Sequence, residues 1–214
     1  MPWNLFSLET KPGKITAIIL LVVFIFVRIL LETIWRSLSE YYSYFFELFF
    51  IALTFFIYRK RITVWKKLRL KDWLIALLSL ASGLVIYKLA SPLGLIVPFD
   101  FKARETLFFL LIVAPLLEEA LFRGALWETL KGFSSRGWFL IIGSTFLFSI
   151  GHLASFWFVP EEFKSFVLYQ ATYVIFLALV LGRQRLKTNS LSVPVVIHFV
   201  FNLGFYLGFY LSAR

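Results

Sequence analysis

Long apolar stretches separated by short polar connections make up most of this chain. About 20 consecutive apolar residues are enough for a helix to cross a bilayer, and the sequence contains seven stretches of roughly that length. We therefore predict an all-α fold, a polytopic transmembrane helix bundle of about seven spans (six to eight), with its polar site enclosed in the bundle. The predicted spans are Ile15–Trp35, Ser43–Tyr58, Trp73–Leu89, Glu105–Trp127, Trp138–Phe158, Phe163–Gly182 and Leu191–Leu211.

The composition supports a membrane protein. Hydrophobic residues make up 60% of the 214 residues, whereas soluble domains are about 45–50% apolar. Seven spans leave little room for a soluble module, so we expect one integral-membrane domain, residues 1–214, with N-terminal spans in 15–104 and a motif-bearing core in 105–214. The chain has no cysteine, which excludes disulfides, thiolate metal sites and thiol nucleophiles.

Positive charge is concentrated in connections between the predicted spans. The net charge is +10, and in a chain this apolar we attribute it to cytoplasmic loops beside an anionic leaflet rather than to nucleic-acid binding. We expect two basic loops and an N-terminus inside the cell. The first loop holds Arg59, Lys60, Arg61, Lys66, Lys67, Arg69 and Lys71, and the second holds Arg183, Arg185 and Lys187.

The fourth predicted span contains two adjacent carboxylates and an arginine. A charge near the bilayer centre costs about 2.5–3.5 kcal/mol on insertion scales, so ionisable residues at that depth indicate a functional site. Glu119 and Arg123 are four residues apart and can pair on one helix face. Glu118 projects about 100° away from Glu119 around the helix, toward the bundle centre. Pro115 cannot donate a hydrogen bond to the carbonyl of Leu111, so we expect a kink one turn before Glu118.

Both histidines of the chain fall in other predicted spans. His152 lies four residues after Phe148, and His198 lies four residues before Asn202, so each pair shares a helix face. A glutamate and two histidines, Glu118, His152 and His198, are a set that can hold Zn²⁺ with one position open for water. A carboxylate and an imidazole can also activate water without a metal, with Asn202 and the other histidine donating to the oxyanion. Both alternatives imply attack of water on a carbonyl.

Three motifs in this order resemble the CAAX protease and bacteriocin-processing family, also called the Abi family, which includes the eukaryotic type II CAAX prenyl endopeptidases. The motif Glu-Glu-x-x-x-Arg matches Glu118, Glu119 and Arg123. Phe-x-x-x-His matches Phe148 and His152, and His-x-x-x-Asn matches His198 and Asn202. The resemblance covers about Glu105 to Leu211.

The resemblance implies an intramembrane endopeptidase. By its pattern, Glu118 and His152 would activate the hydrolytic water, His198 and Asn202 would stabilise the oxyanion, and Glu119 and Arg123 would support and orient them. The family has been described both as metal-dependent and as a metal-free glutamate protease, so Zn²⁺ stays an alternative. The implied substrate is a peptide or protein, lipidated or not, reached from the surrounding membrane lipids. The implied location is a prokaryotic plasma membrane.

Two other functions and one packing question stay open. A non-catalytic membrane adaptor or a bacteriocin self-immunity protein would use the same fold without proteolysis. A proton-coupled carrier would also place Glu and His in the membrane, although the sequence lacks the internal repeat that carriers often show. Gly204 and Gly208 form a small-xxx-small pair that can pack helices within one chain or between two chains, so the oligomeric state is open.

Overall fold

The computed structural model describes residues 13–27, 42–58 and 62–212, and every regular element in them is a helix. This confirms the predicted all-α class. The α-helices are α1 Lys14–Ile25, α3 Tyr42–Tyr58, α4 Leu70–Ala90, α5 Arg104–Phe108, α6 Ala114–Glu119, α7 Leu126–Lys131, α8 Gly137–Leu153, α9 Glu161–Thr188 and α10 Ser192–Ser212. The π-helical segments η2 Phe109–Val113 and η3 Ala120–Ala125 and the 3₁₀ turn η4 Ala154–Trp157 lie between them.

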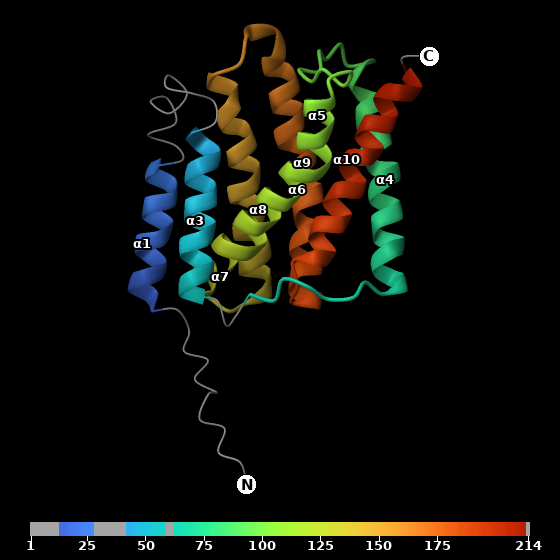
Figure 1. Ribbon diagram of the computed structural model, residues 1–214. Coiled ribbons are helices and arrows are strands. Elements are labelled where there is room, and N and C mark those ends of the chain that lie inside the picture. The colour runs from blue at the N-terminus through green and yellow to red at the C-terminus, as the bar shows by residue number, and fades with distance from the viewer. Residues whose placement is uncertain (1–12, 28–41, 59–61, 213–214) are drawn as a thin grey trace.

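The helices lie side by side with their axes running between the same two ends of the molecule (Figure 1). In the described part of the chain, four helices are long and apolar enough to cross a membrane: α4, α8 continued by η4, α9 and α10. Helices α1 and α3 are shorter apolar helices, and residues 28–35 of the first predicted span lie outside the described residues. The arrangement is a polytopic bundle of the predicted kind.

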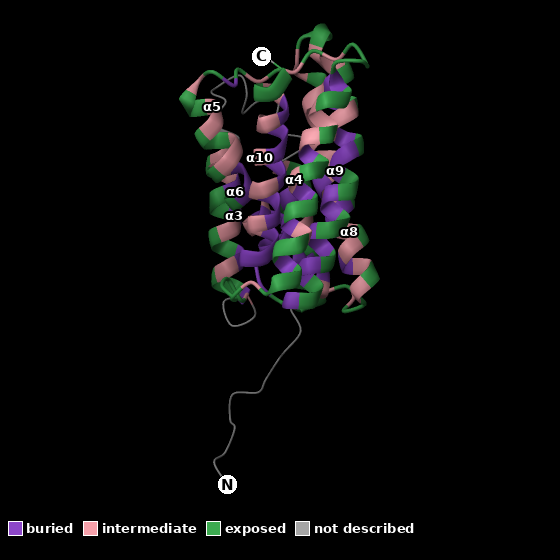
Figure 2. Ribbon diagram, turned by 90° about the vertical axis from the view of Figure 1, so that its right-hand side faces the viewer, coloured by how far each residue is buried: buried purple, intermediate pink, exposed green. Residues whose placement is uncertain are grey.

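Burial in the bundle does not follow polarity. Buried positions face the helices' common interior and exposed positions face outward (Figure 2), yet many exposed side chains are large and apolar, such as Leu74, Leu77 and Leu78 on α4. The buried set includes charged residues such as Glu119, Arg123 and Arg185. An apolar exterior around a partly charged interior is the arrangement that hydrocarbon favours, because lipid chains solvate leucine and cannot solvate a charge.

The fourth predicted span is a series of short helical segments rather than one regular helix. From α5 to α7 the chain stays helical, but η2 and η3 replace two α-helical turns. Segment η2 ends two residues before Pro115, which lies in the first turn of α6. A ring without an N–H disturbs the regular hydrogen-bond ladder, and a π-helical turn is one way in which a helix absorbs such a disturbance. Both carboxylates of the first motif therefore lie between two irregular turns.

Glycines bring α4 and α10 into close backbone contact. A Cβ added to Gly83 would overlap the carbonyl oxygen of Phe201, and one added to Gly204 would overlap that of Leu80. A Cβ on Gly208 would press against the Tyr87 side chain. Helices can approach this closely only where side chains are absent. The small-residue pair on α10 therefore packs inside one chain, against α4.

One end of the bundle is crossed by an extended segment between α3 and α4 (Figure 1). Leu191 and Ser192, at the start of α10, donate backbone hydrogen bonds to the carbonyls of Thr63 and Val64, at 3.1 and 2.9 Å. The segment carries Lys66, Lys67 and Arg69 of the first basic loop, whose Arg59, Lys60 and Arg61 lie outside the described residues. The extended segment thus ties the first basic loop to the helix that carries His198 and Asn202.

The predicted second basic loop is wrong. Helix α9 continues past Gly182 to Thr188, so Arg183, Arg185 and Lys187 are helical. Arg183 is exposed, whereas Arg185 is fully buried. A buried arginine is tolerated where acceptors surround it, and Arg185 has the carboxylate of Glu128 and the carbonyl of Arg123 as partners.

Candidate functional site

The first motif supplies a fully buried ion pair. Glu119 closes α6 and Arg123 lies in η3, and the Arg123 Nη1 donates to Glu119 Oε1 at 2.9 Å. Neither side chain is accessible from outside. The Arg123 Nη2 also donates to the carbonyl of Ala178 on α9, at 3.2 Å. The predicted pairing of these two residues is present, and it offsets the cost of burying each charge.

His198 joins this pair from α10. Its Nδ1 lies 3.0 Å from Glu119 Oε1, the oxygen that also accepts from Arg123. Because an ionised carboxylate only accepts hydrogen bonds, we assign the proton of this contact to Nδ1, with the histidine as donor. The buried carboxylate therefore fixes the orientation of the imidazole, and the opposite ring atom, Nε2, faces away from it.

Glu118 is the more accessible of the two carboxylates. Its side chain is 26% exposed, against 0% for Glu119. The Glu118 Oε2 lies 3.8 Å from the His198 Nε2, which is too long for a direct hydrogen bond. Glu118 and His198 therefore face one another across a short gap at the accessible side of the buried pair.

Phe148 packs against both histidines. Its ring centroid is 4.6 Å from that of His152 and 6.0 Å from that of His198. The guanidinium of Arg123 lies over the same ring, 4.6 Å from its centroid, at the distance of a cation–π contact. The His152 Nδ1 lies 2.9 Å from the Phe148 carbonyl, to which it donates. The second motif thus joins the first and third through an aromatic ring.

Asn202 contacts η2, the first irregular turn of the helical segment α5–α7 that carries Glu118 and Glu119. Its Nδ2 donates to the carbonyl of Leu110, in η2, at 2.8 Å. One turn earlier on α10 is His198, so the third motif contacts the segment α5–α7 at two levels. All six predicted site residues are therefore within one region of the bundle interior, with Glu119, Arg123, His198 and Glu118 in a continuous chain of polar neighbours.

The predicted metal ligands do not assemble into a metal-binding group. Within residues 13–27, 42–58 and 62–212, no three His, Asp or Glu residues are placed to hold a metal ion. The contacts of His198 Nδ1 with Glu119 and of His152 Nδ1 with a backbone carbonyl are compatible with metal ligation through Nε2, so this finding depends on the relative positions of the three side chains alone. The set Glu118, His152 and His198, all within the described residues, does not fit Zn²⁺ in this arrangement.

Two further buried charges were not identified as site residues from the sequence. Arg185 donates from Nε to the Arg123 carbonyl at 2.8 Å and from Nη2 to Glu128 Oε1 at 3.4 Å. Glu128 also accepts from Lys131 at 2.7 Å. One signal in the sequence points to Arg185: positions 171, 174, 178, 181 and 185 repeat at spacings of three and four, which extends the inner face of α9 to the arginine.

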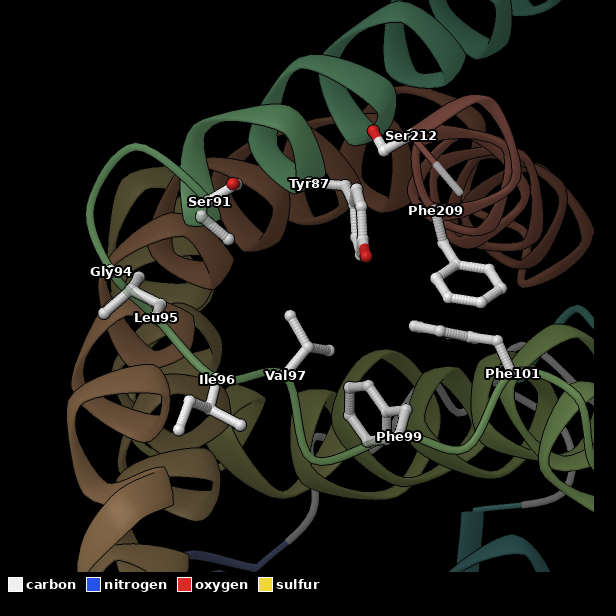
Figure 3. A pocket seen from close by; sticks show the side chains of 11 residues that line it. Tyr87, Ser91, Gly94, Leu95, Ile96, Val97, Phe99, Phe101, Phe209 and Ser212 are labelled. Carbon is white, nitrogen blue, oxygen red and sulfur yellow. The ribbon is translucent and has the colours of Figure 1, made fainter. Parts of the chain in front are cut away.

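A cavity of about 580 Å³ lies at the end of the bundle opposite the extended segment. The end of α4, the connection after it and the end of α10 enclose it, and Figure 3 shows Tyr87, Val97, Phe101 and Phe209 directed into it. None of the six predicted site residues lines it. Phe209 is 11 positions from His198 on α10, about 16 Å at 1.5 Å per residue, so the cavity is a separate feature.

The comparison with protein families gives a match for part of the chain. Residues 102–204 match the family model described as type II CAAX prenyl endopeptidase Rce1-like. The match covers just under half of the chain and includes all three motifs. Neither the curated proteins nor the solved structures give a match.

Proposed function

We propose that this protein is an intramembrane endopeptidase whose reaction is carried by Glu118 and His198, because residues 102–204 match the family model of the type II CAAX prenyl endopeptidase Rce1-like proteins. The observation that carries the proposal is the double role of one oxygen. The Glu119 Oε1 accepts from Arg123 and contacts His198, so a buried ion pair orients the imidazole beside the accessible Glu118. Catalytic histidines are commonly oriented by a carboxylate in this way.

The proposed reaction begins with Glu118 as general base. Its carboxylate takes a proton from water while the water oxygen attacks the scissile carbonyl carbon, and the carbonyl electrons move onto oxygen. His152, whose Nδ1 donates to the Phe148 carbonyl, is proposed to help Glu118 to activate the same water. The tetrahedral intermediate then collapses, the C–N bond breaks, and the leaving amine takes its proton from Glu118.

The negative oxygen of the intermediate needs donors. His198, when its Nε2 also carries a proton, donates from that atom, which faces Glu118. Asn202 has two amide protons, one of which is bound to Leu110, and the other is available for the oxyanion. Such preorganised donors in a water-poor site are worth about 10²–10³ in kcat each.

The proposed substrate is a peptide or protein reached within the membrane, and the protein is proposed to be a multi-pass protein of a prokaryotic plasma membrane. Charge supports an N-terminus in the cytoplasm. The described cations of the first basic loop lie at the same end of the bundle as the α7–α8 connection, which follows Lys131 and carries Arg136 (Figure 1). Basic connections stay on the inner side.

Cleavage of defined peptides by the purified protein in proteoliposomes tests the proposal. Two internally quenched peptides are compared, one with a farnesylated C-terminal CAAX sequence and one without the lipid. We expect wild type to cleave at least one of them, Glu118→Ala and Glu118→Gln to cleave neither, and the matched control Glu105→Gln to cleave at the wild-type rate. Glu105 is exposed near the start of the same long helical segment.

The same variant separates an enzyme from an adaptor. Full cleavage by Glu118→Ala would contradict the proposed role of Glu118. If cells that carry Glu118→Ala in place of the wild-type protein keep the full biological activity, the non-catalytic adaptor or self-immunity function is favoured. The two peptides also decide whether a lipid is required, because a lipid-dependent enzyme cleaves only the farnesylated one.

A further inference from the structure

The π-helical segments η2 and η3 each receive a hydrogen bond from a side chain of another helix. Asn202 on α10 donates to Leu110 in η2, and Arg185 on α9 donates to Arg123 in η3. A π turn departs from the regular ladder of a helix, so its carbonyls are open to donors from outside. The first of these donors belongs to a motif of the proposed site, whereas the second lies outside all three motifs.

Arg185 is held rigidly enough to fix the turn that it contacts. Its side chain is fully buried. Besides the Arg123 carbonyl, it donates to Glu128 on α7 at 3.4 Å and to the side-chain oxygen of Asn189 at 2.9 Å. Asn189 ends α9 in a left-handed conformation, with φ 49°. All three nitrogens of the guanidinium are therefore used, and the planar fork has one orientation.

Arg123 is consequently held to α9 by both its backbone and its side chain. Its carbonyl accepts from Arg185, and its Nη2 donates to the Ala178 carbonyl two turns earlier on α9. Its remaining terminal nitrogen, Nη1, holds Glu119, and Glu119 holds His198. If η3 moved, Arg123 would move Glu119, and Glu119 would change the position of the His198 imidazole.

We propose that Arg185 is a positioning residue of the peptidase site, which fixes the π-helical turn at Arg123 and thereby the contact of Glu119 with His198. The inference rests on the proposed function for its catalytic consequence, but its structural content does not depend on a substrate. Arg185 touches none of the proposed reacting groups. Its effect is exerted through Arg123.

The histidines provide a test that needs no substrate. The chain has two histidines, so selective ¹⁵N-histidine labelling gives NMR signals from two rings only. We expect Arg185→Gln to shift the His198 Nδ1 signal toward that of a ring without a hydrogen bond to a carboxylate, and to leave His152 unchanged. The matched control Arg183→Gln, the same change at an exposed position of the same helix, leaves both rings unchanged.

A second variant covers the case in which the first does not fold. Arg185→Gln removes one of the two cations that contact the buried carboxylate of Glu128 and leaves Lys131. A buried charge that is less well compensated lowers the stability of the fold. The double variant Arg185→Gln/Glu128→Gln removes that charge as well. It is expected to show the same His198 shift. An unchanged His198 signal in a folded variant of either kind would overturn the inference.

Kinetics then separate this inference from the proposed function. We expect the folded variants to lose about 10- to 100-fold in kcat, as for a misplacement of about 1 Å at the site, with KM almost unchanged. Arg185→Lys, which keeps a cation able to donate to the Arg123 carbonyl, is expected to recover most of the loss. If wild type cleaves no peptide, the proposed function fails while the NMR result still decides on Arg185. If wild type cleaves and the variants match its kcat, the positioning role fails alone.

Discussion

The Asn202 amide donates a hydrogen bond to the carbonyl of Leu110, 92 positions earlier in the chain, at 2.8 Å. This bond connects α10 to the irregular turn η2, one helical turn away from the contact between His198 and Glu119. The residue that the family pattern assigns to the oxyanion therefore also holds the helix that carries both carboxylates. A donor with two amide protons can do both.

Substitutions of Asn202 distinguish these two tasks. We expect Asn202→Asp to lower kcat by about 10²–10³, because a carboxylate in place of the amide has no proton for the oxyanion, and to destabilise the fold, because it repels the Leu110 carbonyl. Asn202→Ala should lower kcat similarly, with a smaller loss of stability. Steady-state kinetics and thermal unfolding in detergent measure both effects. Wild-type kcat in a folded Asn202→Ala protein would contradict the oxyanion role.

Neutralising Glu119 is expected to cost both stability and activity. Glu119→Gln leaves Arg123 as a buried cation without its carboxylate, which costs about 3–5 kcal/mol in comparable buried pairs. The double variant Glu119→Gln/Arg123→Met removes the uncompensated charge, and we expect it to regain most of the stability. It should not regain kcat, because His198 still lacks the carboxylate that orients it.

Denaturant unfolding measures the stability of the single and double variants, and peptide cleavage measures their kcat. The proposed role of Glu119 predicts that stability and activity separate in the double variant. A double variant that cleaves at the wild-type rate would mean that the ion pair is structural only.

Several features of the fold could be predicted from the sequence, because each depends on local spacing in an apolar setting. The helical spans follow from hydrocarbon thickness, and the pair of Glu119 with Arg123 follows from a separation of four residues. The contact of Glu119 with His198 could not be derived from spacing, because 79 positions separate them. The family resemblance brought both residues into one proposed site, but it did not indicate which atoms meet.

The second basic loop shows why a charge rule failed in this chain. The three cations after Gly182 predict a loop because cations collect in cytoplasmic connections. That rule takes no account of Glu128, which lies far away in the sequence and provides a buried anion for Arg185. Pro115 predicted a disturbed helix near η2 but not a π-helical turn. The segment η3 could not be foreseen, because its donor Arg185 comes from another helix.

Removal of metal ions is expected to leave the activity intact. In the described part of the chain, Glu118 and His198 have no third His, Asp or Glu with them in an arrangement that could hold a metal ion. We expect cleavage at the wild-type rate after dialysis against EDTA or 1,10-phenanthroline. Loss of activity on chelation, with recovery on addition of Zn²⁺, would contradict the metal-free reaction and favour the set Glu118, His152 and His198.

The close contact of α4 with α10 predicts that added volume there disturbs the site from a distance. Gly83 faces the Phe201 carbonyl, between His198 and Asn202 along α10, and a methyl group at Gly83 would overlap that backbone atom. Because backbone cannot move aside like a side chain, Gly83→Ala should push α10 away from α4. We expect lower thermal stability and a reduced kcat.

Gly182→Ala is the matched control for this change. Gly182 also lies within a helix, but a Cβ there would meet its neighbours at 3.5–3.6 Å, an ordinary contact distance. Alanine gains about 1 kcal/mol over glycine in a helix interior, so Gly182→Ala should be as stable as wild type or more stable, with unchanged kcat. Thermal unfolding and cleavage of the same peptide compare the two variants. If Gly83→Ala were stabilised as much as Gly182→Ala, α4 and α10 would not be in the close contact described, and His198 and Asn202 would not depend on it for their placement.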